Sequence, residues 1–319
     1  MKFTANERSI LKLRKLNWHD QLMGFTFGHM CLKFVFKSLL ISLAFILLSC
    51  KKAGPVEPFE SVPMLYDVLP GFVDEASGIG DSFSNPGFLW VELDSGNPPA
   101  LYLLKHNGTH GKRIFLKGAS NRDWEDLVVS NGPAASKKYI YIGEIGDNNL
   151  AYSQYCIYRL PEPDGSADSV SNFARIDFKY PDGAHDAEAM LVDGETKDIY
   201  IITKRDQYSK VYKLSYPQDT AGLNMASFVM DLPYRGVVSA GIALSQNELF
   251  VKTYSSVYYY KRKNGETIEL TLKQPYQLLT YQVEGQGEAI CFANDNSGFY
   301  TLSEKSFLPA VKLNFYKRK

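Results

Sequence analysis

The chain has no excess of charge of either sign, because its 319 residues include 35 Lys and Arg and 35 Asp and Glu. It therefore offers no strongly basic face of the kind that binds nucleic acid, and it has no acidic tail. Long helical periods are also missing, since no segment repeats its apolar residues every three to four positions over several turns. These absences argue against nucleic acid as a partner and against a helical fold.

Cysteine is scarce, with four residues in the whole chain. Cys31 and Cys50 lie near the amino end, whereas Cys156 and Cys291 lie in separate apolar runs. This excludes a scaffold held together by disulfides, and we expect Cys156 and Cys291 to be buried free thiols. Motifs for a nucleophile elbow, a phosphate-binding glycine loop and a paired-cysteine metal knuckle are missing as well.

A short motif recurs five times, in which a turn passes into a small apolar run. The five copies are Ala76-Ser77-Gly78-Ile79, Trp124-Glu125-Asp126-Leu127, Ala187-Glu188-Ala189-Met190, Ser239-Ala240-Gly241-Ile242 and Gly287-Glu288-Ala289-Ile290. When Ser77, Glu125, Glu188, Ala240 and Glu288 are taken as equivalent, their spacings are 48, 63, 52 and 48 residues. A period near fifty is typical of propellers and repeat arrays, in which no unit can bury its own apolar face.

Each repeat continues with two more short runs, rich in Val, Ile, Tyr and Phe and separated by a polar turn. Such runs predict strands, and four-stranded units of this length predict the blades of a β-propeller. The fold class is therefore all-β, with five blades as the first expectation. Six blades remain an alternative if residues 161–182 contain a degenerate unit.

The fifth repeat ends after its third strand, and residues 64–69 precede the first repeat without a unit of their own. We expect this amino-terminal segment to supply the missing outer strand of the last blade. Pairing the two ends would close the ring and remove an exposed edge.

A closed ring places the turn that enters each inner strand on the same face as the turn between the second and third strands. Three of the five equivalent positions carry Glu, and like charges near one axis repel unless something positive lies between them. Oxygen ligands from several blades suit Ca²⁺, so we expect an axial Ca²⁺ held by Ser77, Glu125, Glu188 and Glu288. The alternative is that these carboxylates bond backbone amides of neighbouring blades, with water in the channel.

The same mouth would gather two further groups of polar residues. The candidates for contacting a substrate are Asp94, Arg122, Asp147, Asn148, Lys204 and Arg205. The candidates for acid–base catalysis are Asp123, His185 and Asp186.

Four segments carry a resemblance to known proteins: Asp94–Pro99 (DSGNPP), Asn121–Leu127 (NRDWEDL), Gly146–Asn149 (GDNN) and Tyr180–Ala189 (YPDGAHDAEA). They resemble a family of secreted bacterial β-propeller proteins without an assigned activity. A more distant similarity is to calcium-dependent apyrases and to β-propeller phytases. Apyrases are five-bladed propellers whose central Ca²⁺ is held by Glu and Ser at the heads of inner strands, which matches Ser77, Glu125, Glu188 and Glu288. This resemblance implies a propeller with an axial Ca²⁺.

The amino end has the layout of a secretory signal. In KFVFKSLLISLAFILLSC (residues 33–50), two lysines precede an apolar region from Ser38 to Leu48. The final Leu47-Leu48-Ser49-Cys50 resembles a bacterial lipobox, which implies that Cys50 is lipidated. A transmembrane anchor is the alternative, but the uninterrupted run is about half of the roughly 20 residues that a bilayer requires.

The expected organisation follows from these patterns. Residues 1–29 are interpreted as an overcalled or extended start, 30–49 as a lipoprotein signal peptide, 50–61 as a tether and 62–319 as the propeller. The protein would then be a lipoprotein of the bacterial cell envelope, anchored to the membrane by lipid on Cys50, either periplasmic or surface-exposed.

Two classes of function fit this organisation. One is a module that binds a glycan, a peptide or a partner protein of the envelope through the mouth. The other is a metal-dependent phosphohydrolase, in which Asp123 or Asp186 activates water and Arg122, Lys204 and Arg205 neutralise the developing charge. We favour the binding module, because the mouth carries at least as many acids as bases and no motif fixes a catalytic role.

The lipoprotein interpretation makes a direct prediction. Replacing Cys50 by Ala removes the sulfur that would carry the lipid, so the variant should leave the membrane fraction or remain unprocessed. Membrane fractionation and the mass of the mature chain measure this. A variant that stays in the membrane at the wild-type level would contradict the lipoprotein interpretation.

Overall fold

The computed structural model describes residues 56–305 and 311–319. The expected start segment, signal peptide and lipidation site at Cys50 therefore lie outside the described residues. Chain contacts join Glu57–Lys319 into one unit. In the described ranges, no helix has the length and apolar character needed to cross a membrane.

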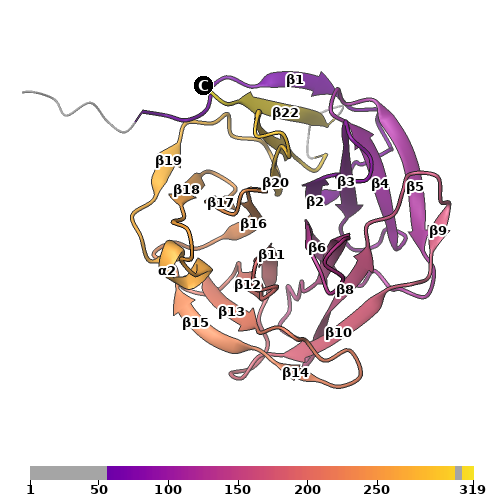
Figure 1. The fold of residues 1–319 in the computed structure, drawn as a ribbon, viewed down its shortest axis with the longest axis vertical. Coiled ribbons are helices and arrows are strands. Elements are labelled where there is room, and N and C mark those ends of the chain that lie inside the picture. Colours follow the sequence, from indigo (N-terminus) through magenta and orange to yellow (C-terminus); the bar gives the residue numbers. More distant parts are fainter. Residues whose placement is uncertain (1–55, 306–310) are drawn as a thin grey trace, which may run out of the picture. The chain divides into compact units, whose positions relative to one another are not determined.

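The strands of this unit form five sheets arranged around an axis, which confirms the predicted five-bladed β-propeller (Figure 1). Counted from the axis outward, the first blade contains β2 (Ala76–Asp81), β3 (Phe88–Leu93), β4 (Ala100–Lys105) and β5 (His110–Leu116). The second contains β6 (Trp124–Asn131), β7 (Lys138–Glu144), β8 (Tyr155–Pro161) and β10 (Ala174–Lys179). The third contains β11 (Ala187–Val192), β12 (Ile199–Thr203), β13 (Lys210–Leu214) and β15 (Ser227–Asp231).

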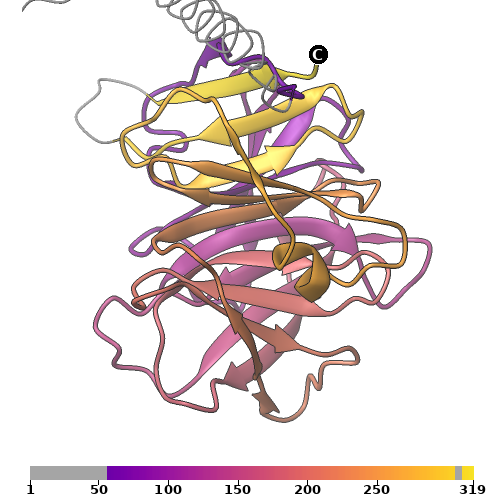
Figure 2. The ribbon, with the colours of Figure 1, turned by 90° about the vertical axis from the view of Figure 1, so that its left-hand side faces the viewer.

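The fourth blade contains β16 (Val237–Ile242), β17 (Glu248–Thr253), β18 (Val257–Lys261) and β19 (Gln277–Leu279). The fifth contains β20 (Ala289–Phe292), β21 (Gly298–Leu302), β22 (Lys312–Lys317) and β1 (Met64–Asp67). Two short parallel strands extend blades 1 and 2, namely β9 (Ser169–Val170) and β14 (Asn224–Met225). A short helix, α2 (Ile268–Leu272), lies at the outer rim beside blade 4 (Figures 1 and 2).

The stretch from 161 to 182, which could have concealed a sixth blade, forms no blade of its own. It supplies β10, the outer strand of blade 2, and β9, which pairs with the edge of blade 1. Five is therefore the number of blades in the described chain.

The ring closes as predicted through the amino-terminal segment. Strand β1 pairs antiparallel with β22, with Met64 opposite Phe315 and Asp67 opposite Lys312. The outer edge of blade 5 is thus covered by a strand from the other end of the chain, which blocks pairing with another molecule along β22.

The propeller begins earlier than the expected boundary at Val62. Phe59 is only 2% exposed, and its ring meets Phe299 edge-on at 4.9 Å between centroids. The amide of Glu60 also donates to the Lys317 carbonyl at 2.8 Å. The segment expected to be a tether therefore ends near Glu57. The sequence did not reveal this boundary, because a single aromatic residue among polar neighbours gives no periodic signal.

The core lies between blades, because each strand alternates its side chains between two neighbouring interfaces. On β12, Ile199 and Ile201 pack against blade 2, whereas Tyr200 and Ile202 pack against blade 4. Five such clusters occur, one at each junction between adjacent blades in the described structure. Cys156 and Cys291 belong to two of these clusters as buried free thiols, as predicted.

A one-residue bulge interrupts the inner strands of blades 1 to 4. The bulged residues are Ser77, Glu125, Glu188 and Val238, since the register shifts across each of these positions. The predicted equivalence of Ala240 is therefore wrong by two residues. The Ser239–Ile242 segment resembles the other motifs in composition, but the position of the bulge sets the true register. When Val238 replaces Ala240 as the equivalent residue of blade 4, the spacings between equivalent residues become 48, 63, 50 and 50.

Ring closure by the amino-terminal segment predicts a strong effect of Phe59→Ala. Removing a buried phenyl group from the junction of blades 4 and 5 should lower the free energy of unfolding by about 3–5 kcal/mol. Val62→Ala is the matched control, because Val62 is 77% exposed. Urea denaturation measures both variants, and equal midpoints for the two would show that the segment does not stabilise the ring.

Candidate metal centre

The turns that follow the second strands lie beside the entrances to the inner strands. The amide of Asp94 donates to the Glu75 carbonyl at 2.9 Å, and the amide of Lys204 donates to the Asp186 carbonyl at 2.9 Å. Blade 5 repeats the contact from the Glu304 amide to the Gln286 carbonyl, also at 2.9 Å. Polar residues far apart in the sequence are thereby gathered at one mouth of the channel.

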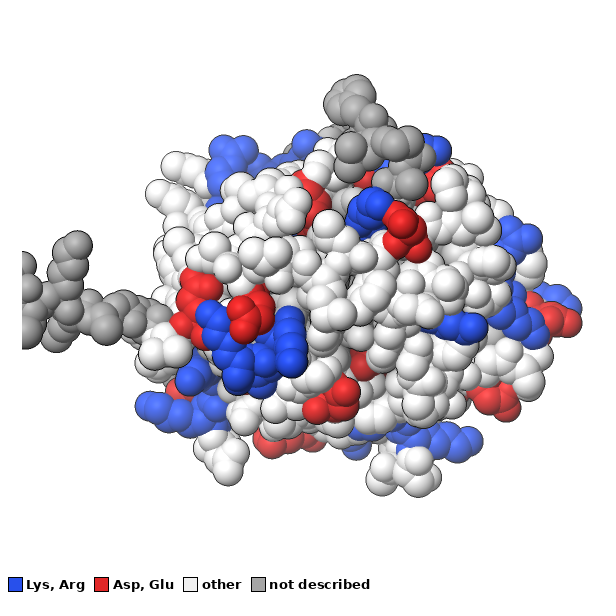
Figure 3. Space-filling view, turned by 90° about the horizontal axis from the view of Figure 1, so that it is seen from above, with Lys and Arg blue, Asp and Glu red and all other residues white. Residues whose placement is uncertain are grey.

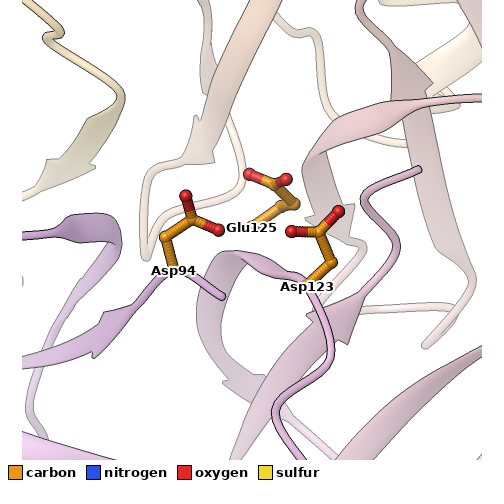
Figure 4. Close-up of side chains that lie close together, drawn as sticks. All are labelled: Asp94, Asp123 and Glu125. Carbon is orange, nitrogen blue, oxygen red and sulfur yellow. The ribbon is translucent and has the colours of Figure 1, made fainter. Parts of the chain in front are cut away.

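Two groups of three carboxylates meet at this mouth and share Glu125. One group is Asp94, Asp123 and Glu125, and the other is Glu125, Asp186 and Glu188. Within each group, one oxygen from every residue lies within 4.8 Å of the others. Figure 4 shows the first group, whose carboxylates turn toward a common space. Glu125 and Glu188 are bulge residues, and bulges commonly re-aim side chains near functional sites.

Gly146, from the GDNN turn, makes room for these carboxylates. A Cβ at this position would overlap both the Glu125 and the Asp123 carboxylates. The amide of Gly146 also donates to the Asp123 carbonyl at 3.2 Å. The glycine in this turn is therefore required by close approach to the cluster.

Burial and mutual repulsion raise the pKa values of Glu125 and Asp123 in the cluster and of Glu304 beside it. Burial, followed by the charges of Glu188, Asp94 and Asp123, raises the pKa of Glu125 well above its ordinary value. Burial, then Asp94, raises the pKa of Asp123 to about 6. At the edge of the cluster, burial and Glu288 raise the pKa of Glu304 to about 8. These three carboxyl groups are therefore harder to ionise than exposed ones, because burial and neighbouring acids both disfavour their charged form.

Several buried polar atoms around the cluster have no hydrogen-bond partner within the described chain. They are Oε2 of Glu188, Oγ of Ser77 and both carboxylate oxygens of Glu92. Buried polar atoms in native proteins are nearly always satisfied, so an unpaired set indicates a missing partner. The Glu188 side chain is 4% exposed, and its second carboxylate oxygen belongs to this unpaired set.

Glu92 is the acidic residue that the sequence analysis missed. It lies on β3 opposite Gly78, and a Cβ on Gly78 would approach a Glu92 carboxylate oxygen to 2.7 Å. Burial, then the charge of Asp126, raises the pKa of Glu92 well above its ordinary value. The available signal was a single acid inside the otherwise apolar run FLWVEL.

Lys204 supplies a positive charge at the mouth. Its Nζ contacts Oε1 of Glu188, donates to the Tyr254 hydroxyl at 3.0 Å and lies 3.7 Å from Oε1 of Glu288. Tyr254 in turn donates its hydroxyl to Glu288. Burial lowers the pKa of Lys204, but Glu188, Tyr254 and Glu288 outweigh burial and raise it above its ordinary value. Of the three glutamates expected to share one centre, Glu125 and Glu188 lie in one carboxylate group, whereas Glu288 lies on the other side of the Lys204 ammonium from Glu188.

The other expected basic residues already have partners. Arg205 donates from Nε to Asp186 at 2.6 Å and also contacts the side-chain oxygen of Asn148. Arg122 stacks on the Tyr152 ring, with 3.8 Å from its guanidinium carbon to the ring centroid. Arg205 is thus held by blades 2 and 3 and Arg122 by blade 2, whereas the buried Nε of Arg122 has no hydrogen-bond partner in the described chain.

Asp147 and His185, two further predicted site residues, are tied into local networks. The Asp147 carboxylate accepts from the Ala151 and Tyr152 amides at 2.7 and 2.9 Å, so it stabilises the GDNN turn and is not offered to a ligand. The His185 ring lies between Asp206 at Nδ1 and Asp182 at Nε2, each at 3.1 Å. Asp123 is not among the hydrogen-bond partners of His185 in the described structure.

Asp126 shows the alternative to metal binding, in which an inner-strand carboxylate bonds backbone amides of a neighbouring blade. This fully buried carboxylate accepts from the Met190 amide at 2.7 Å, the Leu127 amide at 3.0 Å and the Ser239 hydroxyl at 3.2 Å. It joins blades 2, 3 and 4 at the axis. Glu125, the neighbouring residue in the sequence, belongs instead to the two carboxylate groups at the mouth.

Charged side chains of both signs lie together on one side of the ring (Figure 3). On the face drawn in Figure 3, Lys and Arg lie beside Asp and Glu.

No protein-family model matches the chain, and no curated protein matches it in sequence. Among solved structures, the PQQ-bound aldose sugar dehydrogenase from Streptomyces coelicolor is 8% identical, with a TM-score of 0.43, over 82% of this chain and 100% of that chain. A chain of the nidogen/laminin complex is 9% identical, with a TM-score of 0.41, over 72% of each chain. Similarities at this level carry no information about ligand or activity.

Proposed function

We propose that the protein is a cell-envelope module that binds a Ca²⁺ ion at the mouth of its channel and presents that face to a ligand or partner protein. The observation that carries the proposal is the pair of carboxylate groups that share Glu125, together with the unpaired buried oxygen of Glu188. The lipobox-like Leu47–Cys50 supports the location, and the DSGNPP and GDNN motifs support membership of the secreted propeller family.

Electrostatics favours a cation at this place. At the 4.8 Å limit that separates these oxygens, two ionised carboxylates repel by about 3 kcal/mol at an effective dielectric constant of about 20. Burial weakens solvation and adds to this cost. A divalent cation among Asp94, Asp123, Glu125, Asp186 and Glu188 would offset both terms.

The chemistry of the donors selects the kind of cation. All members of the two groups are carboxylates, without His or Cys. Oxygen donors suit hard cations, and Ca²⁺ accepts six to eight of them in flexible geometry, whereas structural zinc prefers His and Cys. The unpaired Ser77 hydroxyl is a further oxygen donor on the neighbouring inner strand.

The contacts of the basic residues favour binding over phosphoryl chemistry. Arg205 is held by Asp186 and Lys204 by Glu188, so neither is free to neutralise a phosphate. A polyanion would also meet a mouth that is acidic before the cation binds. Uncharged glycans, or peptides that complete the coordination of the ion, fit this mouth better.

A metal-dependent hydrolase is the second candidate, and the carboxyl group of Asp123 is the observation in its favour. With its pKa raised to about 6, this group is ionised at neutral pH yet basic enough to accept a proton from water. A screen with nucleotides, phytate and aryl phosphates distinguishes the candidates. Turnover that is abolished both by a chelator and by Asp123→Asn would replace the binding proposal with the hydrolase.

Calcium should stabilise the folded protein. Ligand binding at about 100 times the dissociation constant adds about 2.7 kcal/mol, so millimolar Ca²⁺ should raise the melting temperature and a chelator should lower it. Glu125→Gln should reduce this response by about half or more, because Glu125 belongs to both groups. Glu195→Gln removes an exposed acid that follows β11 and serves as the control. Identical melting with Ca²⁺ and with chelator would disprove the proposed function.

The calcium response should grow with pH. Raised pKa values mean that the metal-free fold binds protons more tightly than the unfolded chain, so its stability falls as pH rises. For Asp123 the loss occurs between the ordinary pKa of 3.8 and about 6, and for Glu304 between 4.5 and about 8. Ca²⁺ requires the ionised carboxylates, so its stabilising effect should be small near pH 5 and large near pH 8. Thermal melts with and without Ca²⁺ across this range measure the effect, and a response independent of pH would contradict it.

A further inference from the structure

Lys204 divides the acidic mouth into two halves. It is the first residue after β12, and its Nζ is shared by Glu188, Tyr254 and Glu288. The side chain is only 13% exposed, so the ammonium is held among these oxygens with little contact with solvent. An ammonium has three donors, which these three neighbours can occupy. The half of the mouth between blades 3 and 5 is thereby supplied with a positive charge from the chain itself.

Glu188 is the residue at which the two halves meet. One of its oxygens contacts Lys204, whereas the other is buried without a partner within the described chain. Glu188 also belongs to the carboxylate group that contains Glu125 and Asp186. On the far side of the lysine, Glu288 accepts from the Tyr254 hydroxyl and is not part of either carboxylate group.

The position that Lys204 occupies recurs around the ring with different chemistry. The residue directly after the second strand is Asp94 in blade 1, Lys204 in blade 3 and Tyr254 in blade 4. Asp94 adds negative charge to the cluster around Glu125, whereas Lys204 donates to Glu188 and Tyr254 donates to Glu288. Because of this asymmetry, the negative charge around Glu125 would be balanced only by a bound cation, whereas Lys204 already balances the charge between Glu188 and Glu288.

We infer that Lys204 is a built-in cation that takes the place of a second metal ion between Glu188 and Glu288, and thereby confines Ca²⁺ to the half of the mouth around Glu125. Glu288 is then the partner of the lysine and not a ligand of the metal. This inference rests on the proposed function. It adds that Lys204 determines where Ca²⁺ binds and how many ions bind.

The physical basis is competition between two kinds of positive charge for the same oxygens. Lys204 is tethered and always present, so a free cation cannot displace it without leaving the ammonium buried and unpaired. Lys204→Met keeps a chain of similar length and removes the charge. The oxygens of Glu188, Glu288 and Tyr254 would then be free to coordinate an ion.

Calcium titration by calorimetry tests this inference on the wild type and two variants. Lys204→Met should bind one more Ca²⁺ per chain than the wild type. Lys210→Met is the matched control and should match the wild type, because Lys210 pairs at 3.0 Å with Asp182, which belongs to neither carboxylate group. Equal stoichiometry in the wild type and Lys204→Met would overturn the inference alone, whereas a wild type without Ca²⁺ binding would overturn the proposed function as well.

A second variant tests the assignment of Glu288 even if Lys204→Met fails to fold. Glu288→Gln should keep the wild-type stoichiometry and a calcium affinity within about threefold, because its carboxylate lies with the lysine. Glu125→Gln should weaken binding by about tenfold or more under the same conditions. A comparable loss in Glu288→Gln would place the metal between Glu188 and Glu288 and would overturn the inference.

Discussion

The need of each blade to bury two apolar faces is the constraint on which the whole structure depends. Side chains on a strand such as β12 alternate between the junction with blade 2 and the junction with blade 4, so no blade is stable without both neighbours. The ring must therefore close, and β1 completes blade 5 by pairing with β22. Phe59 extends this closure by packing into the junction of blades 4 and 5.

Ring closure also creates the electrostatic problem at the axis, because it brings five inner strands together at their entrances. Two solutions stand side by side in the motif Trp124-Glu125-Asp126. Asp126 is compensated by amides and a hydroxyl from the surrounding inner strands. Glu125 meets four other carboxylates instead. Of these, Asp186 is paired with Arg205 and Glu188 with Lys204, whereas Glu125, Asp94 and Asp123 have no basic partner among the described residues. We interpret the carboxylates without a basic partner as the group that attracts a cation. On the opposite side of the mouth, Lys204 compensates Glu188 and Glu288.

Sequence periodicity was sufficient to predict the strands, the five blades and the closing strand, because alternating apolar residues and turn residues report local structure directly. It was also sufficient to bring Asp94, Asp123, Glu125, Asp186 and Glu188 to one mouth. Features that depend on tertiary contacts were missed or misassigned. The register of blade 4 follows from a bulge at Val238. The Glu92 carboxylate lies where a side chain on Gly78 would collide with it, and Asp147 stabilises its own turn. No local pattern distinguishes a lysine that binds a substrate from one that neutralises two glutamates, so the place of Lys204 required the structure.

The central claim is that an ion occupies the carboxylate cluster around Glu125. Anomalous diffraction from crystals grown with Ca²⁺ tests it most directly. We predict an anomalous peak coordinated by Glu125 and by oxygens of Asp94, Asp123, Asp186 or Glu188, with the Lys204 ammonium remaining between Glu188 and Glu288. A mouth that contains only water at saturating Ca²⁺ would contradict the account.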